Sequence, residues 1–460
     1  MYRQNYFGRR KENTMKENLF TKRGASYKKE AFSFCEEYKS FLSRAKTERL
    51  CVDYFEEKAK KNGFLSIEEK TSFNPGDKVY YIHNQRSAIF AIIGEEALEK
   101  GINLVVSHID SPRLDLKPSP ITEEASFSYF RTHYYGGIKK YQWVTIPLAM
   151  YGVVIKKDGT KIDVNVGDNE DDPVFMISDL LPHLASKQMG MKMNEGITGE
   201  KLMVIAGSDE ADCDKDKLKT NLLNILKEKY DIEEDDFYSA EIQIVPAGKA
   251  KDLGFDRSLI AGYGHDDRIC AYPSFEALLK TNSPKRTAVV LLADREEVGS
   301  MGNSGMQSTF LQYFLEEIDK NVRLNKLFKN TFCLSSDVSA AFDPIYPEVY
   351  EKQNSPICGC GLSLLKYTGS RGKGGSSEAS AELVAYIRKI FDKDDVGYQF
   401  AELGKVDEGG GGTVAQYIAN LGAEVIDAGV PLLSMHAPFE IAHKADIYEA
   451  YKAYLSFFGN

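Results

Sequence analysis

Apolar and polar positions alternate along the chain with two different periods, which predicts both helices and strands. Residues 31–62 place apolar side chains at helical spacing among charged ones, as in one or two amphipathic helices. Residues 79–94 form two apolar runs typical of a strand hairpin, and residues 102–107 predict a short buried strand. From about residue 257 onward, strand patterns alternate with helical ones, which is typical of a layered α/β domain with a largely parallel sheet.

The stretch from about residue 116 to 256 differs from both flanks. Aromatic and β-branched residues dominate it, with turn signals such as Asp158-Gly159 and one acidic helical stretch over 209–236. The chain of 460 residues is also longer than one hydrophobic core usually supports. We therefore predict an α/β domain with a mostly parallel central sheet flanked by helices, formed by residues 21–115 and 257–460. Residues 116–256 would form an inserted β-rich domain.

Composition excludes several classes of protein. An apolar content of 43%, with 26 Tyr and 25 Phe, excludes intrinsic disorder. The apolar stretch over residues 143–155 is too short to cross a bilayer and contains Thr and Pro, so we expect no membrane partner. The net charge of -10 argues against a general nucleic-acid partner.

The N-terminal end has the opposite charge to the rest of the chain. Residues 1–30 hold nine Lys and Arg against three Glu, and we expect residues 1–20 to be a flexible basic arm. Met15 is an alternative start, because the fold signals begin after it. An apolar secretory segment is absent, and the seven Cys lack zinc-ligand spacing, so we expect reduced thiols and a cytoplasmic protein.

Four predicted strands, over 104–107, 287–293, 332–336 and 431–435, end in groups that bind metals or move protons. These groups are His108 and Asp110, Glu296 and Glu297, Asp337, and His436. The motif His265-Asp266-Asp267-Arg268 precedes a helix predicted over 269–279. Each motif alone is more often a hydrogen-bonded turn or a solvated face. Because carboxyl ends of parallel strands open on one crevice, we expect the set to lie together on one sheet.

This mixture of imidazoles and carboxylates suits zinc, cobalt or manganese. Two metals about 3.5–4 Å apart need a bridging carboxylate, and Asp266 is suited to that place. Of the adjacent Glu296 and Glu297, one can bind metal while the other remains free as a general base. Asp110 can accept the second ring N–H of His108 and so fix its tautomer.

Residues 108–115 read His-Ile-Asp-Ser-Pro-Arg-Leu-Asp, which resembles the His-x-Asp-Ser-Pro box of the aspartyl aminopeptidase family of dizinc aminopeptidases. The similarity runs in family order from about residue 20 to the C-terminus. The further matching segments are Tyr135-Gly136-Gly137 with Trp143, Asp266-Asp267-Arg268, Asp294 to Ser300, Ser336-Asp337, and Leu433 to His436.

The resemblance implies a site with two divalent metal ions per subunit, zinc by family and cobalt or manganese as alternatives. His108 and Asp337 would bind one ion, Glu297 and His436 the other, and Asp266 both. Glu296 would be the general base, and Asp110 would orient His108. The free α-amine of a peptide substrate would lie near the second metal, which limits cleavage to one residue at a time.

The resemblance also implies a homo-oligomer. In the family, the inserted domain builds a dimer, and dimers assemble into a dodecamer. His183, in Leu181-Pro182-His183-Leu184, is a candidate to reach the active site of the neighbouring subunit. A loop histidine that caps the backbone is the alternative.

Two positions depart from the eukaryotic members of the family. Ala340 and Asp343 stand where those members have histidines, so the match is closer to a bacterial branch. Selection of an N-terminal Asp or Glu needs a cation in the pocket, since an unpaired buried carboxylate is costly. Arg371 and Lys373, in a Gly-rich loop, are candidates for that cation, and a solvated loop is the alternative. Gly409 to Thr413 resembles the family's substrate loop and lacks the Lys of a nucleotide loop.

We therefore expect a metal-dependent aminopeptidase that removes the N-terminal residue, including Asp or Glu, from peptides. A related dimetal deacylase or carboxypeptidase is one alternative, because Glu296 would serve it equally well. A non-catalytic assembly or binding protein on a peptidase fold is the other, although such a protein would be expected to have lost ligands.

Overall fold

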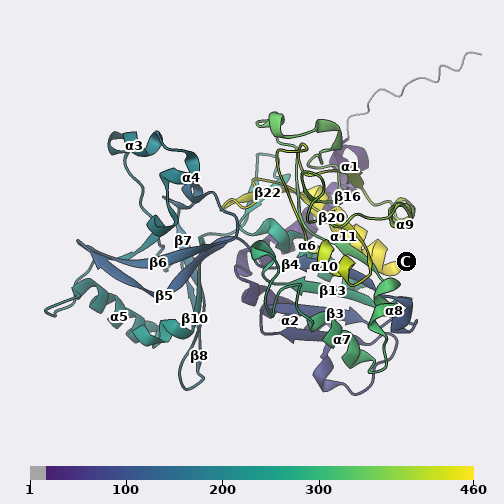
Figure 1. Ribbon diagram of the computed structural model, residues 1–460, viewed down its shortest axis with the longest axis horizontal. Coiled ribbons are helices and arrows are strands. Elements are labelled where there is room, and N and C mark those ends of the chain that lie inside the picture. The colour runs from purple at the N-terminus through teal and green to yellow at the C-terminus, as the bar shows by residue number, and fades with distance from the viewer. Residues whose placement is uncertain (1–16) are drawn as a thin grey trace, which may run out of the picture.

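A nine-stranded, mostly parallel sheet lies at the centre of the larger part of the molecule (Figure 1). The computed structural model describes residues 17–460. The four central strands of the sheet run parallel, and an antiparallel neighbour flanks them on each side. This confirms the predicted α/β fold. The strand order is β1 (Leu65–Ser66), β2 (Lys78–His83), β3 (Ser87–Ile92), β13 (Ala288–Ala293), β4 (Asn103–His108), β14 (Phe332–Ser335), β20 (Glu424–Gly429), β16 (Leu362–Leu365) and β18 (Tyr398–Phe400).

Helices cover both faces of this sheet, so its strands are apolar on both sides. Along β13, Val290 and Leu292 pack into one core and Val289 and Leu291 into the other, as the alternation of a strand requires. One core receives α1 (Leu19–Arg44), α2 (Glu48–Lys61), α6 (His265–Lys280), α9 (Ala381–Lys393) and α11 (Lys444–Gly459). The other receives α7 (Phe310–Ile318), α8 (Leu324–Lys329) and α10 (Ala415–Asn420).

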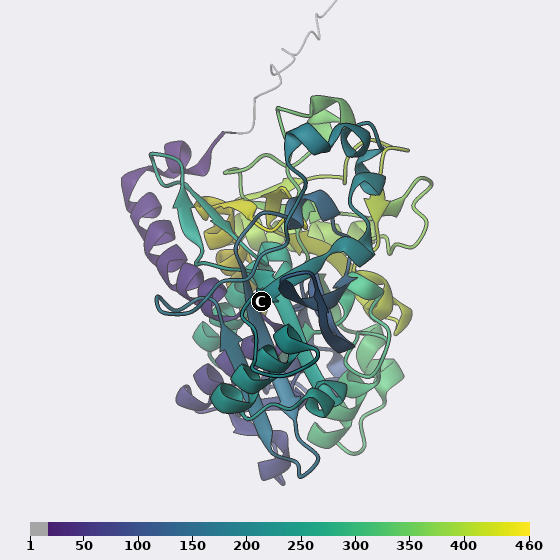
Figure 2. The ribbon, with the colours of Figure 1, turned by 90° about the vertical axis from the view of Figure 1, so that its left-hand side faces the viewer.

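A separate six-stranded antiparallel sheet stands beside the larger part, at the left of Figure 1 and facing the viewer in Figure 2. It has its own core around the buried Trp143, against which α5 (Lys217–Tyr230) packs through Leu222 and Leu226. The sheet begins at Arg113, just before the predicted start of the insertion at residue 116. Its order is β8 (Lys161–Val166), β7 (Leu148–Ile155), β10 (Ala240–Pro246), β5 (Arg113–Glu124), β6 (Phe127–Tyr135) and β9 (Met203–Gly207).

Two smaller sheets complete the fold. The first has the order β11 (Lys251–Leu253), β12 (Leu259–Gly262), β22 (Glu440–His443), β21 (Pro431–Leu433) and β15 (Ser339–Ala340). The second pairs β17 (Gly369–Ser370) with β19 (Gly410–Gly411). The strand that precedes His436 is therefore not part of the central sheet, and the expectation that all the candidate ligands follow strands of one sheet was wrong for this residue.

Several predicted elements are confirmed. The helices expected over 31–62 are parts of α1 and α2, and residues 79–94 form the β2–β3 hairpin. Most of the predicted basic arm lies outside the described residues; within its described part, α1 already begins at Leu19. None of the helices over residues 17–460 is both long and apolar enough to span a bilayer.

Candidate functional site

Three neighbouring strands of the central sheet bring candidate residues to one edge. β4 lies between β13 and β14, and His108 at its end pairs with Ala293 at the end of β13. The turn that follows β13 carries Glu296 and Glu297 in a 3-10 helix, and Asp337 follows β14. Because the three strands are parallel, these side chains meet beyond the same carboxyl edge, as the sequence predicted.

Asp266 reaches the same edge from the N-terminal end of α6. The preceding Gly264 has φ +76°, and a Cβ there would lie 2.0 Å from Nη1 of Arg268, so glycine is required. The buried Arg268 guanidinium donates to the carbonyls of Ile109 and Lys46. The hydroxyl of Ser111 donates to the Asp266 carbonyl at 2.7 Å. These contacts fix the beginning of α6 against the end of β4.

The two carboxylate oxygens of Asp266 face two different histidines. Oδ1 lies 3.1 Å from Nε2 of His108, and Oδ2 lies 3.3 Å from Nε2 of His436. Glu297 lies 3.5 Å from Nε2 of His436. Asp337 and Glu296 lie 3.8 and 3.9 Å from Nε2 of His108. The structure therefore brings together five candidate ligands and the candidate base.

The hydrogen bonds of both imidazoles point the Nε2 atoms into this cluster. Nδ1 of His108 lies 3.0 Å from the carbonyl oxygen of Asp110, and Nδ1 of His436 lies 2.8 Å from that of Gly137. A carbonyl oxygen only accepts, so each Nδ1 carries a proton, and Nε2 is the ring atom that remains to bind a metal in place of its own proton.

Carboxylates outnumber the cationic groups of the cluster, which are its two histidines. Burial raises the pKa of Glu296 to about 7, against the opposing charge of His108. Burial and the charge of Asp266 raise the pKa of Glu297 well above its usual range, and burial likewise raises that of Asp337. Within residues 17–460, the ion pairs of these carboxylates are with histidines and not with Lys or Arg.

These groups fit a metal centre. Oε1 of Glu297 is buried without a hydrogen-bond partner among the described residues. Buried carboxylates at this density need a cation or protons to be stable. Three sets of side chains have ligand atoms close enough to hold an ion: His108 with Asp267 and Asp337, His108 with Glu296 and Glu297, and Asp266 with Glu297 and His436.

Asp110 connects the residues around His108. Its fully buried carboxylate accepts the main-chain N–H groups of Glu296 and Glu297, at 3.1 and 3.2 Å, and the hydroxyl of Tyr135 at 2.7 Å. One of its oxygens also lies 3.3 Å from Nδ1 of His108. It therefore contacts both glutamates and the histidine at once.

Sequence reasoning missed Glu440. This buried carboxylate accepts the main-chain N–H groups of His436 at 2.7 Å and Asp266 at 3.0 Å, and so joins two candidate ligands from different elements. Burial raises its pKa to about 8. A charged residue at the start of the short strand β22, before Ile441 and Ala442, was the available signal. Asp267, which follows Asp266, entered the sequence analysis only as part of a motif. The structure places it buried beside His108 and Asp337.

Three other candidates are not joined to this cluster by any contact within residues 17–460. His183 is exposed on a 3-10 turn of the segment that joins β8 to β9. Arg371 and Lys373 are exposed in the loop after β17 and line a small cavity of about 120 Å³ with Glu402 and Lys405. Lys373 pairs with Glu378 at 3.0 Å and lies over the ring of Tyr367.

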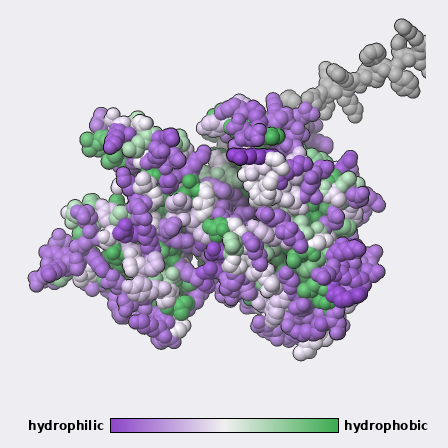
Figure 3. Space-filling view, viewed as in Figure 1, coloured by the Kyte–Doolittle hydropathy of each residue, from purple (hydrophilic) through white to green (hydrophobic). Residues whose placement is uncertain are grey.

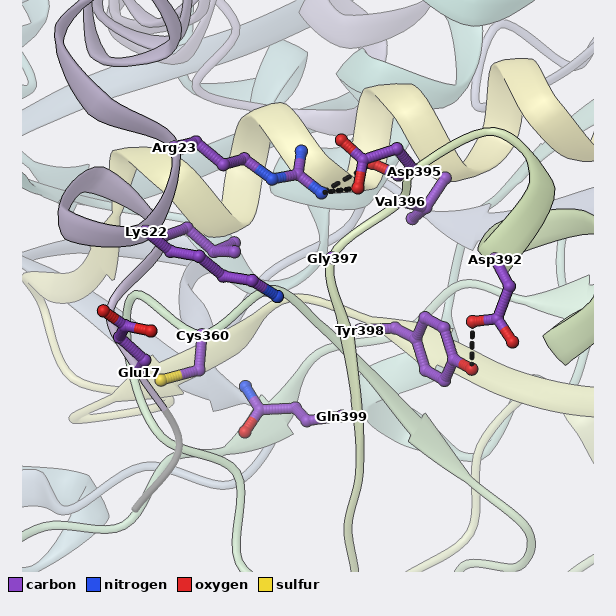
Figure 4. A pocket seen from close by; sticks show the side chains of 11 residues that line it. Glu17, Lys22, Arg23, Cys360, Asp392, Asp395, Val396, Gly397, Tyr398 and Gln399 are labelled. Carbon is purple, nitrogen blue, oxygen red and sulfur yellow. Dashed lines mark hydrogen bonds and ion pairs between the residues drawn. The ribbon is translucent and has the colours of Figure 1, made fainter. Parts of the chain in front are cut away.

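A larger cavity of about 870 Å³ lies away from the cluster, between the beginning of α1 and β18 (Figure 4). Arg23 on its wall is paired with Asp395 and Glu449, and Tyr398 donates to Asp392. The side chain of Gln399 is bonded to main-chain groups. These polar groups already have partners, and none of the candidate metal ligands lines this cavity.

Comparison with known proteins agrees with this geometry. Residues 41–458 match the family described as Aminopeptidase I zinc metalloprotease (M18). A probable M18 family aminopeptidase 1 of Borrelia garinii subsp. bavariensis is 48% identical, covering 96% of this chain and 99% of the relative. The crystal structure of an M18 family aminopeptidase from Thermotoga maritima superposes with a TM-score of 0.93 at 44% identity, covering 97% of this chain and 99% of the other.

The crystal structure of aminopeptidase I from Clostridium acetobutylicum gives the same TM-score of 0.93 at 48% identity, covering 97% of this chain and all of the other. Sequence, fold and the cluster of metal-binding side chains thus agree over nearly the whole chain. The chain belongs to the M18 family of zinc metalloproteases and is a metallo-aminopeptidase.

Proposed function

We propose that the cluster holds two divalent metal ions, zinc by family, and that it removes N-terminal residues from peptides. His108 and Asp337 would hold one ion, Glu297 and His436 the other, and Asp266 would contact both. The observation that carries this assignment is the placement of Asp266, with one oxygen 3.1 Å from His108 and the other 3.3 Å from His436.

When bound, two such ions would supply Lewis acidity: they would polarise the scissile carbonyl and lower the pKa of a water molecule, so that hydroxide is available as the nucleophile. Glu296 is the proton carrier. Its carboxylate lies at the rim of the cluster with 19% of the side chain exposed, and burial brings its pKa to about 7. It takes a proton from the attacking water and gives it to the leaving nitrogen. Asp110 holds the main-chain N–H of Glu296 and so keeps this residue at the rim.

Replacing Glu296 by Gln tests this assignment, because the amide keeps the size and loses the proton acceptor. We expect kcat to fall by ~10²–10⁴, the range for general acid–base catalysis, with the metal content unchanged. The exposed Glu408→Gln is the matched control. Full activity of E296Q would contradict the role of Glu296. Product analysis with N-acetylated and free peptides checks that a free amine is required.

We also propose that residues 116–256 form a dimerisation domain and that the catalytic domain comprises residues 21–115 and 257–460. Apolar side chains gather on the segment around α3 (Ser186–Met189) and α4 (Met193–Gly196), at the upper left of Figure 3. Leu184, Met189 and Met193 are about 70% exposed. An apolar patch of this kind is typical of an interaction surface. A yeast relative, 22% identical with a TM-score of 0.75, is described as a dodecamer.

His183 lies on the same segment and would act in the site of a neighbouring subunit. Mixing two inactive variants tests this. In a hetero-dimer of H183A and E296Q, the H183A subunit keeps Glu296 and receives His183 from its partner. We expect the mixture to regain activity that neither variant has alone, and no recovery in a mixed oligomer would contradict the assignment.

Arg371 and Lys373 would meet an acidic side chain at the substrate's N-terminal residue, because two cations in one exposed loop can pair with a carboxylate. A panel of aminoacyl substrates decides between acidic and neutral preference. We expect R371A/K373A to lose rate selectively on Asp and Glu substrates, with neutral ones unaffected.

A further inference from the structure

A loop of the six-stranded sheet reaches the metal cluster on the central sheet. It comprises Tyr135, at the end of β6, with Gly136 and Gly137. The hydroxyl of Tyr135 donates to Oδ2 of Asp110 at 2.7 Å, and the carbonyl of Gly137 accepts from His436 at 2.8 Å. The loop therefore contacts both halves of the cluster, although its strand belongs to a different sheet.

The two glycines of this loop lie close to the metal cluster. Gly136 has φ +74°, and a Cβ there would lie 3.3 Å from Oε2 of Glu297. A Cβ on Gly137 would lie 3.3 Å from Nδ1 of His436. Both values are tighter than ordinary carbon contacts, so the main chain itself forms part of the wall around Glu297 and His436.

Arg113 covers the ring of Tyr135, and a series of side chains from β5, α2 and β10 in turn holds Arg113. The guanidinium of Arg113 on β5 lies over the ring, 3.8 Å from its centre. Arg113 is itself held by Asp115 at 2.8 Å and lies 3.6 Å from Glu48 of α2. Gln243 on β10 donates to both oxygens of Glu48, at 2.9 and 2.8 Å. The Tyr135 hydroxyl is therefore a preorganised donor rather than a freely rotating one.

Asp110 is the residue on which this donor acts. Its Oδ2 accepts from Tyr135 and from the main chain of Glu297, and its Oδ1 accepts from the main chain of Glu296. Without the hydroxyl, Oδ2 would lose its shortest hydrogen bond, and the carboxylate could turn away from His108. A residue of the other sheet thus holds the Asp110 carboxylate, which lies against His108 and accepts from the main chain of both glutamates.

We propose that Tyr135 is a positioning residue for the metal centre, and that the six-stranded sheet supports the metal ligands through it in addition to any part it has in assembly. Tyr135 acts through Asp110 and does not itself touch the substrate. This inference rests on the proposed metal centre at His108, Asp266, Glu297, Asp337 and His436.

The test replaces Tyr135 by Phe, which removes the hydroxyl and keeps the ring under Arg113. Tyr134→Phe is the matched control, since the adjacent side chain points to the opposite face of the sheet and is 42% exposed. Zinc affinity of the metal-free proteins is measured by competition with a chelator. We expect Y135F to bind zinc about 10-fold more weakly, as is typical when a hydrogen bond that supports a metal ligand is lost. We expect Y134F to match the wild type.

Two further measurements separate positioning from a general loss of structure. The thermal midpoint of Y135F should stay near that of the wild type, and kcat should fall with KM nearly unchanged. In a double-mutant cycle with Asp110→Asn, the second substitution should add little, because both remove the same support. Additive losses would overturn the claim that Tyr135 acts through Asp110.

Each outcome has a distinct meaning. If the wild type itself binds no zinc at the cluster, the proposed metal centre fails. If the wild type binds zinc and Y135F equals it in zinc affinity and kcat, the positioning role alone fails. If Y135F does not fold, Arg113→Lys is measured instead, since it keeps the charge near Glu48 and loses the planar stacking. It should weaken zinc binding in the same direction, and unchanged zinc binding would overturn the proposal.

Discussion

The two histidines of the metal cluster stand in contrasting surroundings. His108 ends a central strand of the nine-stranded sheet, and its side chain is 1% exposed. His436 follows a strand of the small five-stranded sheet, and its side chain is 34% exposed. His108 is held by Asp110, two residues further along the same chain segment, whereas His436 is held by Gly137, a residue of the loop after β6.

This difference separates a buried half of the cluster from an open half. The buried half rests on neighbouring parallel strands whose register fixes the side chains. The open half joins three segments that are distant in sequence: the turn after β13, the turn after β21 and the loop after β6. A ligand set on a rigid frame loses less conformational entropy on binding, so the buried half should hold its ion more tightly. The open half is where a substrate can approach.

Removing the two histidines one at a time should give the largest effects. We expect His108→Ala to lose the tightly held ion and, with it, the charge that steadies Asp266, so that the purified protein retains little metal. We expect His436→Ala to retain one ion per subunit and to lose activity. Metal content after dialysis, measured by elemental analysis, checks both. Equal metal content in the two variants would show that the two halves do not differ in how tightly they hold their ions.

The sequence was sufficient to predict the buried half but not the supports of the open half. His108, Asp337 and the two glutamates each follow an apolar run, and the parallel strands predicted for those runs bring their ends together. The expected sheet for His436 was wrong because a three-residue strand carries no sign of which sheet it joins. Glu440 and Gly137 act through main-chain contacts across long sequence distances, which no local pattern records.

Glu440→Gln should give an intermediate effect, largest on the open half. An amide cannot accept from both the His436 and the Asp266 main-chain N–H groups, so one buried donor loses its partner, at a cost of about 1–3 kcal/mol. We expect zinc affinity to fall ~10–100-fold for one of the two ions, measured by chelator competition.

Asp446→Asn is the matched control for Glu440→Gln. Asp446 is also a buried carboxylate that accepts two main-chain N–H groups, those of Gly359 and Gly361, both at 2.7 Å. It forms no contact with the metal ligands among the described residues. We expect D446N to lose stability and to keep its zinc affinity. Similar losses of zinc affinity in both variants would show that the effect of Glu440 is general destabilisation.

The smallest effect on catalysis should come from Lys46, which lies between α1 and α2 and contacts the segment at the end of β10 in the six-stranded sheet. Its buried ammonium donates to the carbonyl of Gly248 at 2.7 Å and lies 4.0 Å from Asp168. Burial lowers its pKa from 10.5 to about 8, with Asp168 opposing and Arg268 adding to the shift. Lys46→Met should therefore leave kcat and zinc affinity unchanged and alter only how stability depends on pH.

The sign of that dependence follows from proton binding. Between pH 8 and 10.5 the unfolded chain holds a proton on Lys46 that the folded protein has released, so stability rises with pH in this window. From pH 7 to pH 10 the wild type should gain about 2 kcal/mol relative to K46M, measured by urea unfolding. Lys157→Met, at an exposed lysine, is the control. The wild type should gain no stability relative to K157M between pH 7 and pH 10. If K46M instead lowered zinc affinity as Y135F is expected to, support of the metal centre would be a property of the whole junction between the sheets and not of the loop after β6.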